Sequence, residues 1–434
     1  MNQKKNTSKF WVALTLFSLV GQVAWVVENM YFNIFIYKMF HASAEAISMM
    51  VSASAVSATV TTILVGALSD KIGKRKVFIC GGYMLWGISI FLFSLVRMDI
   101  IESVFPATAA TAASIGITLV IVLDVIMTFF GSAANDACFN AWLTDVTDET
   151  NRGRAEGINS MMPLVAILVV FGGFMSFDLN QAKSWSIIYT IIGVVVFVIG
   201  ILAIFLIKDV PIDTSQNQYY FKNLLYGYRP SIIKENKLFY IILAAYATFC
   251  ISIQIYMPYL ILYYNVSLGL NNYVLIMAPA VIVAAIVTAL YGRVYDKFGF
   301  KTAVVPAIST LMIGYILLYL FKNTALVFVG SLFMMSGYLM GMAVFGAMLR
   351  DYTPENRAGS FQGLRIVGQV LIPGIIGPAI GAAVLKNAEQ ILNDDGTYSF
   401  IPNANIFLAA LIAACFIWLI LALIFKLIKQ DKGE

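Results

Sequence analysis

The sequence predicts an all-α membrane protein with twelve transmembrane helices in two pseudo-symmetric six-helix bundles. Three observations predict this fold: an apolar composition, twelve long apolar segments and an internal repeat. Of the 434 residues, 60% are hydrophobic and 12% are charged, and the mean hydropathy is +0.85. Soluble domains average about 45–50% apolar and about 25% charged residues. This composition excludes an ordinary soluble enzyme, a disordered chain and a nucleic-acid-binding module.

Twelve segments are long and apolar enough to cross a bilayer, which takes about 20 mostly apolar residues. Strands of a membrane barrel would instead run about 9–11 residues with alternating polarity. The first segment is too long for the core of a cleaved signal peptide, so we expect it to be retained. The segments are 10–37, 45–68, 77–96, 118–143, 157–179, 184–207, 238–264, 271–292, 302–321, 325–348, 362–385 and 403–427.

The positions of Lys and Arg predict that both ends of the chain are cytoplasmic. With that orientation, 23 of the 28 Lys and Arg residues lie on the cytoplasmic side and five lie outside. Cytoplasmic loops of membrane proteins carry such an excess. The one long polar break, 209–237, is the expected linker between bundles at 1–208 and 238–434. We further expect a monomer in a bacterial plasma membrane, surrounded by lipid and without a nucleic-acid partner.

A short motif follows both the second and the eighth segment. The run GALSDKIGKRK begins at Gly66, and the run GRVYDKFGFK begins at Gly292, so that the Asp, Lys and Gly positions align at an offset of 226 residues. A second pair of runs, 145–157 and 351–363, matches at five positions with an offset of 206. An irregular insert of 20 residues near 97–116 accounts for the change of offset. Parallel repeats of this kind build one large class of secondary transporters.

The first of these motifs resembles the cytoplasmic signature of the major facilitator superfamily. With the twelve segments, the resemblance covers nearly the whole chain. The run NDACFNAWLTD from Asn135 to Asp145 further resembles the fourth helix of glycoside–pentoside–hexuronide:cation symporters, the melibiose permease-like carriers. This resemblance implies sugar transport with a cation, and it implies that Asp136 helps to bind that cation. Those carriers also use Asp residues in the second helix, where residues 46–69 have none. Sodium coupling, proton coupling and passive transport therefore stay open, and we favour the proton.

Charged side chains inside a span are costly, at about 2.5–3.5 kcal/mol each, and usually face a partner or an aqueous cavity. Glu28 lies deep in the first span, and Trp25 and Tyr31 share its helical face at i−3 and i+3. A carboxylate beside aromatic rings suits a sugar, because it accepts hydroxyl hydrogen bonds while a ring stacks on the pyranose. A structural hydrogen bond to another helix is the alternative. The expected substrate contacts are Glu28, Trp25, Tyr31, Asn29, Gln254, Tyr256, Tyr259, Asn140 and Gln369.

The fourth span carries a polar stripe, and Asp136 is its candidate ligand for a cation or proton. Asn135, Asp124 and Arg365 complete the expected cation-coupling set. Two alternatives stay open. Glu28 could be the proton site while Asp136 joins helices, and Arg365 could snorkel to the headgroups or contact a gate.

Charged residues at the cytoplasmic rim are expected to form a gate and not to touch the substrate, as the superfamily resemblance implies. They lie in or beside the repeated motifs. These residues are Asp70, Lys71, Gly73, Arg75, Asp145, Arg152, Asp296, Lys297, Asp351 and Arg357.

The sequence therefore predicts a secondary active transporter of a small solute, a sugar or glycoside, in symport with a cation by alternating access. A carrier or exporter of amphipathic, drug-like or lipid-like solutes is the alternative. No nucleophile–base constellation indicates an enzyme. The single histidine, His41, and the absence of a Cys cluster indicate no metal and no cofactor other than a coupling ion, H⁺ or Na⁺.

Overall fold

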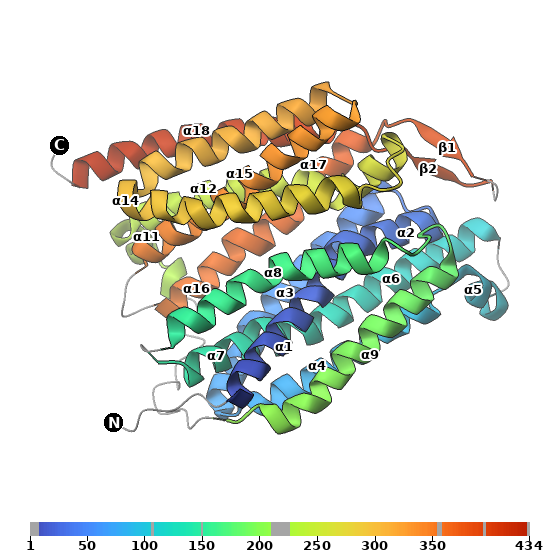
Figure 1. Cartoon of the computed structure of the whole chain (residues 1–434), viewed down its shortest axis with the longest axis horizontal. Helices are drawn as coiled ribbons and strands as arrows, with labels where there is room; N and C mark the ends of the chain where they lie inside the picture. The colour runs from blue at the N-terminus through green and yellow to red at the C-terminus, as the bar shows by residue number, and fades with distance from the viewer. Residues whose placement is uncertain are drawn as a thin grey trace. The chain divides into compact units, whose positions relative to one another are not determined.

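A computed structural model describes residues 8–105, 108–148, 151–209, 226–353, 358–393 and 396–431. The chain divides into two compact units. Unit 1 comprises Met1–Ala46, Ala53–Tyr220 and Leu392–Ser399, and unit 2 comprises Ile47–Ser52, Phe221–Ile391 and Phe400–Glu434. In Figure 1 most helices of unit 1 run from blue to green, and those of unit 2 run from yellow-green to red.

Unit 1 contains six long helical spans. The first is continuous from α1 (Ser8–Val26) through the π-helical segment η1 (Val27–Tyr31) to α2 (Phe32–Phe40). The others are α3 (Ala44–Ile72), α4 (Arg75–Leu92), α6 (Ala109–Gly131) continued by η3 (Ser132–Phe139) and α7 (Asn140–Val146), α8 (Arg152–Phe174) and α9 (Ala182–Leu206). A short turn, η2 (Phe93–Leu95), extends α4. The irregular insert near 97–116 includes a short helix, α5 (Met98–Val104), and the first turns of α6.

Unit 2 begins with η5 (Tyr226–Tyr228) and α11 (Pro230–Glu235). Its first span joins α12 (Lys237–Tyr256), a 3₁₀ turn η6 (Met257–Tyr259), α13 (Leu260–Leu262) and a π-helical segment η7 (Tyr263–Ser267). The 3₁₀ turn contains Pro258, which cannot donate the hydrogen bond that an α-helix needs at that position. The later elements are α14 (Val274–Leu320), α15 (Thr324–Asp351), α16 (Ala358–Ile366), η9 (Val367–Leu371), α17 (Ile372–Leu385) and α18 (Asn405–Asp431). Between α17 and α18 lies a hairpin of β1 (Gln390–Leu392) and β2 (Tyr398–Phe400), whose residues Leu392–Ser399 belong to unit 1.

The described residues contain eleven helices long and apolar enough to cross a membrane, and one of them, α14, holds two spans. Its 47 residues would reach about 70 Å as a straight helix, more than twice the hydrocarbon thickness. Gly299 breaks it with φ 75° and ψ 179°. The hydroxyl of Tyr291 donates to the carbonyl oxygen of Ala303 at 2.8 Å, so the two arms fold back on each other. The twelve predicted spans are thus all present.

The repeat predicted from the sequence is visible in the backbone. Gly73 takes φ 70° after α3, and Gly299 takes φ 75° between the two arms of α14. Only glycine reaches such positive φ values without strain. Both copies of the motif therefore use their glycine to turn the chain from one span into the next.

Glycines also allow helices within a unit to pack closely. A Cβ atom at Gly87 of α4 would lie 2.4 Å from the backbone nitrogen of Phe197 in α9. In unit 2, a Cβ atom at Gly314 of α14 would lie 2.3 Å from the backbone nitrogen of Met334 in α15. Small residues allow this close backbone approach between membrane helices.

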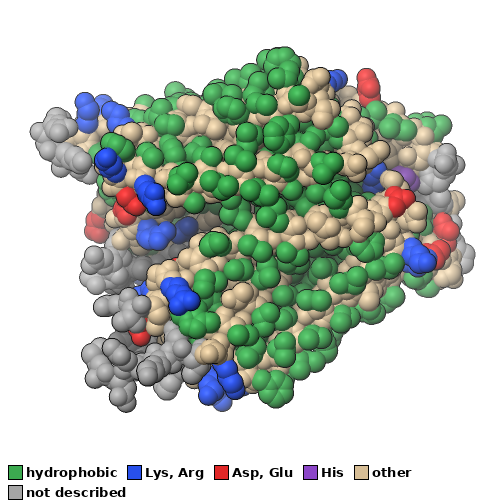
Figure 2. Space-filling view, in the orientation of Figure 1, with side chains coloured by type: hydrophobic (Ala, Val, Ile, Leu, Met, Phe, Trp, Pro, Cys, Tyr) green, Lys and Arg blue, Asp and Glu red, His purple; other side chains and the backbone are tan. Residues whose placement is uncertain are grey.

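Hydrophobic side chains cover most of the face drawn in Figure 2, and charged side chains gather toward the ends of the helices. The exposed apolar residues of α9 include Ile191, Val194 and Val198. A bilayer accommodates such a surface, whereas the helices satisfy their backbone polar groups internally. The chain is an integral multi-pass membrane protein.

Candidate functional site

Four of the spans contain a π-helical segment, and three of these segments carry predicted site residues. Glu28 and Asn29 lie in η1, Asn135 and Asp136 in η3, and Gln369 in η9. Short π-helical segments inside α-helices are rare and are often found at functional sites. Neither hydropathy nor the α-helical period indicated these segments.

In unit 1, Asp136 and Trp25 form a partly exposed pair inside two spans. Both side chains are half-buried. The Asp136 carboxylate accepts a hydrogen bond from the Ser132 hydroxyl at 3.0 Å, and the Trp25 side chain lies close enough to interact with it. Asn29 and Asn140 are exposed one turn beyond, and each donates to the backbone of its own helix. Their amide oxygens remain available as acceptors.

Glu28, in contrast, points into the interior of unit 1. The residue is 7% exposed. Its Oε1 atom accepts hydrogen bonds from the hydroxyls of Ser54 in α3 at 2.5 Å and Thr128 in α6 at 2.9 Å. These two hydroxyls also lie 2.8 Å apart. The sequence did not single out Ser54. The only signal was a serine-rich second span with no acid between residues 46 and 69.

Asn135 joins three segments of unit 1. Its amide nitrogen donates to the Tyr83 hydroxyl at 2.6 Å, and Tyr83 in turn donates to the Phe17 carbonyl oxygen at 3.0 Å. The Trp25 indole donates to the Asn135 oxygen at 3.4 Å. A Cβ atom at Gly21 would lie 2.3 Å from the Asn135 nitrogen, so the first span needs glycine there. This network holds η3 beside α1 and α4.

The Tyr31 ring packs on α8. The residue is fully buried, and its ring packs against Phe174 and Phe171 of α8, with centroids 4.6 and 6.4 Å away. The Trp25 ring packs on Trp86 of α4, with the ring centroids 5.0 Å apart. The three residues that the sequence placed on one helical face therefore contact different neighbouring helices.

The predicted site residues of unit 2 also differ in burial. Tyr256 and Tyr259 are fully buried, whereas Gln254 is half-buried. Gln254 packs against Gly377 of α17, because a Cβ atom added at Gly377 would lie 2.4 Å from the Cβ atom of Gln254. Arg365 donates to the Gln369 oxygen at 3.3 Å. Gln254, Arg365 and Gln369 are thus the half-buried polar groups of unit 2 among the predicted site residues.

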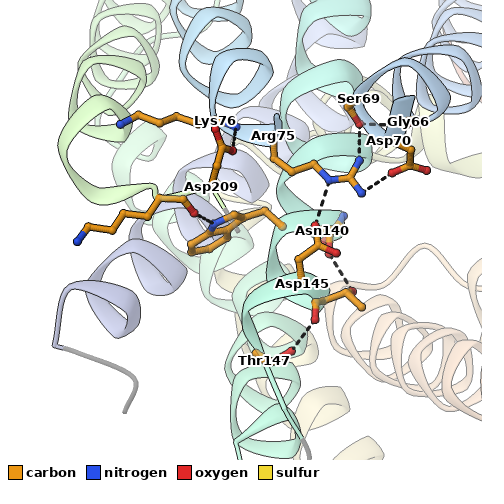
Figure 3. Close-up of polar contacts among 12 residues, drawn as sticks. Gly66, Ser69, Asp70, Arg75, Lys76, Asn140, Asp145, Thr147 and Asp209 are labelled. Atoms are coloured by element: carbon orange, nitrogen blue, oxygen red, sulfur yellow. Dashed lines mark hydrogen bonds and ion pairs between the residues drawn. The ribbon is translucent and has the colours of Figure 1, made fainter. Parts of the chain in front are cut away.

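A charged cluster occupies the end of α3 and the start of α4 in unit 1 (Figure 3). The Arg75 side chain, at 7% exposure, forms ion pairs with Asp70 and, at 3.1 Å, with Asp145. It also donates to the Ser69 hydroxyl at 2.5 Å. The backbone N–H of Lys76 donates to Asp209 at 2.8 Å. Arg75 thereby joins the motif after α3 to the end of the fourth span.

The second copy of the motif is built differently. In unit 2 the Tyr295 hydroxyl donates to the Asp351 carboxylate, while Asp296 and Lys297 are exposed. Of the other predicted gate residues, Lys71 is exposed and Arg152 donates to the Thr147 carbonyl oxygen at 3.5 Å. Arg357 lies outside the described residues.

Two further features bear on the site. A pocket at the other end of unit 1 is lined by Phe35, Phe93, Arg97 and Trp185, among others, and none of the predicted site residues lines it. Within the described ranges, no group of three or more His, Cys, Asp and Glu side chains is placed to hold a metal ion.

Two units of six spans, with acidic side chains inside the spans, match the plan of secondary transporters built from two repeats. The sequence profile of the Major Facilitator Superfamily matches residues 12–378 and 281–433. The chain therefore belongs to the major facilitator superfamily, as its motifs indicated, and it is a transporter and not an enzyme. The finer resemblance to melibiose permease-like carriers stays a prediction.

Solved structures of transporters share this fold. The nucleoside transporter NupG is 13% identical, with a TM-score of 0.68 over 96% of this chain and 98% of that chain. A bacterial homologue of the human lysosomal transporter Spinster, inward-facing and unoccupied, is 15% identical, with a TM-score of 0.69 over 97% of each chain. A D-xylose–proton symporter is 13% identical, with a TM-score of 0.66 over 94% of this chain and 97% of that chain. No curated protein sequence matches the chain.

Proposed function

We propose that this protein transports a small polar solute of the sugar class, coupled to a cation, with a proton favoured over sodium. The observation that carries the proposal is the half-buried Asp136 carboxylate beside the half-buried Trp25 ring, within the spans of unit 1. A carboxylate accepts hydrogen bonds from sugar hydroxyls, and an indole offers an apolar face for the C–H side of the ring. The structurally similar D-xylose–proton symporter agrees with this class of solute.

We assign the solute contact in unit 1 to Asp136 and not, as the sequence suggested, to Glu28. Asp136 is partly exposed, whereas the Glu28 carboxylate is buried and accepts two hydroxyl hydrogen bonds at its Oε1 atom. Asn29 and Asn140, exposed one turn away, add further acceptors. Gln254, Gln369 and Arg365 are the proposed contacts of unit 2, because they are the half-buried polar groups among its predicted site residues. Tyr31, Tyr256 and Tyr259 are fully buried and are not proposed as solute contacts.

The test is a binding screen of the purified protein against monosaccharides, disaccharides and nucleosides, followed by counterflow in vesicles. A hydrogen bond to a charged group contributes about 1.5–3 kcal/mol, so Asp136→Asn should weaken binding of the selected sugar about 10- to 100-fold. Unchanged sugar affinity in this variant would refute the assignment.

Asp178→Asn is the matched control. Asp178 lies between α8 and α9, outside the spans, and accepts a hydrogen bond from the backbone N–H of Asn180 at 3.0 Å. This bond and those from the side chains of Gln181 and Asn180 hold the pKa of Asp178 below its usual value. The residue is therefore ionised throughout the assay, and the variant removes one acid without changing sugar affinity.

A carrier of amphipathic or lipid-like solutes is the competing function, since one fold hosts many substrates. Binding of a quaternary ammonium dye, with no response to any sugar, would favour it. We also propose a monomer in a bacterial plasma membrane with both termini cytoplasmic, because the Lys and Arg excess favours that orientation.

A further inference from the structure

Among the described residues of unit 1, six buried side-chain atoms have no hydrogen-bond partner, and three of them belong to side chains that act on one another electrostatically. These three atoms are Oε2 of Glu28, Oδ1 of Asp124 and the hydroxyl oxygen of Tyr189. Glu28 is 7% exposed, Asp124 is 1% exposed and Tyr189 is fully buried. Buried polar atoms in native proteins are nearly always paired, so these three atoms need an explanation.

The fold brings the two acids into one electrostatic environment. Asp124 lies one turn from Thr128 on α6, and Thr128 donates to Glu28 at 2.9 Å. Glu28 and Asp124 interact electrostatically, and Asp124 also acts on Tyr189 of α9. Asp136 is a third acid that acts on Glu28.

These acids lack a basic partner in the part of the chain that the structure describes. The ion pairs found there involve Arg75 and Arg97, and neither contacts Glu28 or Asp124. The groups that face the pair are hydroxyls and acids: Ser54 from α3, Thr128 from α6, Tyr189 from α9 and Asp136 from η3.

Two carboxylates in one buried site without a cation repel each other strongly, because the surroundings screen their charges poorly. A single proton removes one negative charge. It also supplies an O–H donor, which a pair of ionised carboxylates lacks. One bound proton therefore removes one negative charge and also supplies the hydrogen-bond donor that the site lacks.

We infer that Glu28 and Asp124 form one proton-binding site in unit 1, and that this shared proton is the ion coupled to solute movement. The second part rests on the function proposed above. A sodium ion fits less well, because the hydroxyls of Ser54 and Thr128 bond directly to Glu28 and to each other, at 2.5, 2.9 and 2.8 Å. These three oxygen atoms are therefore already engaged with one another.

The test counts protons without any solute. Purified protein in lipid nanodiscs is titrated across about pH 5 to 8, and infrared difference spectra record the carbonyl band of the protonated carboxylic acid. The proteins compared are wild type, Glu28→Gln, Asp124→Asn and the double variant, with Asp178→Asn as the control. Wild type and the control should show the same pH-dependent band, and the double variant should lose it.

A shared proton makes the two single substitutions non-additive, because each variant retains one of the two acids that hold it. Additive losses, or an unchanged band in the double variant, would overturn the inference. Carbodiimide labelling of the wild-type protein gives a second measurement that needs no variant, since the reagent modifies protonated carboxyl groups. Mass spectrometry should find label on Glu28 or on Asp124, never on both in one molecule. Label on both together, on neither, or on Asp136 alone would contradict a shared site.

Vesicle uptake separates this inference from the proposed function. Loss of pH-driven accumulation in the double variant, with counterflow retained, would support the coupling role. Accumulation that persists in the double variant would overturn that role, even if the shared proton is found. A shared proton in a protein that moves no sugar would instead refute the proposed function and leave the proton site standing.

Discussion

Replacement of Arg75 by alanine should destabilise unit 1 by an amount that its contacts allow us to estimate. The guanidinium group, at 7% exposure, contacts Asp70, Asp145 and Ser69. Hydrogen bonds to charged groups contribute about 1.5–3 kcal/mol each, and breaking a fully buried ion pair costs about 3–5 kcal/mol. The two carboxylates are 23% and 25% exposed, so water recovers part of this cost. We expect Arg75→Ala to lower the free energy of unfolding by about 2–4 kcal/mol.

The repeat supplies a matched control. Lys301 aligns with Arg75 at the offset of 226, is exposed, and places its ammonium 5.6 Å from the ring centroid of Phe425. An exposed cation–π contact contributes about 0.5–1 kcal/mol, so Lys301→Ala should cost no more than this. Arg75→Lys should fall between the two, because lysine retains the charge and loses the forked geometry.

The assay is denaturant unfolding of the purified protein in detergent, followed by tryptophan fluorescence. Asp145→Asn in the Arg75→Ala background should recover part of the lost stability, since it removes an unpaired negative charge. Wild-type stability in Arg75→Ala, or no recovery in the double variant, would show that the Arg75 cluster does not contribute as calculated.

Three further predictions follow from packing, hydrogen bonding and topology. Gly87→Ala should lower the free energy of unfolding by about 1–3 kcal/mol through overpacking between α4 and α9, whereas Gly81→Ala on the same helix, where a Cβ meets nothing within 4 Å, should not. Tyr83→Phe should cost about 1–3 kcal/mol in the same unfolding assay, because it leaves a buried donor unpaired. Tags in the 209–237 linker should react only with reagents on the cytoplasmic side, and tags in the 387–402 loop only with external reagents. The reverse labelling pattern would refute the proposed orientation.

The long-range plan of the molecule was predictable from sequence, because hydropathy and glycine report directly on spans and turns. The motif glycines Gly73 and Gly299, which align in the repeat, both adopt positive φ. The 3₁₀ turn at Pro258 likewise follows from its missing N–H. Such features depend on single residues or on composition, and not on which helix faces which.

The local geometry around Glu28 was not predictable in the same way. Placing Trp25 and Tyr31 on its face assumed α-helical spacing, but Glu28 and Tyr31 lie in the π-helical segment η1. The i→i+5 hydrogen bonding of a π-helix widens the turn and changes which residues share a face. The hydroxyl of Ser54 reaches Glu28 from another helix, and no periodicity within one span reports such a contact.

The four π-helical segments also give the spans a way to move that does not break their hydrogen bonding. If a π segment returns to α-helical pairing, the chain beyond it shifts by one residue, which is a rotation of about 100° and a rise of about 1.5 Å. A bulge that migrates along its helix would turn the residues it passes while both ends of the span stay anchored. The segments η1 and η3 hold Glu28 and Asp136, so such a screw motion would change the direction in which an acid points. The backbone would exchange one set of internal hydrogen bonds for another, so no backbone group would be left unpaired in a membrane interior without water.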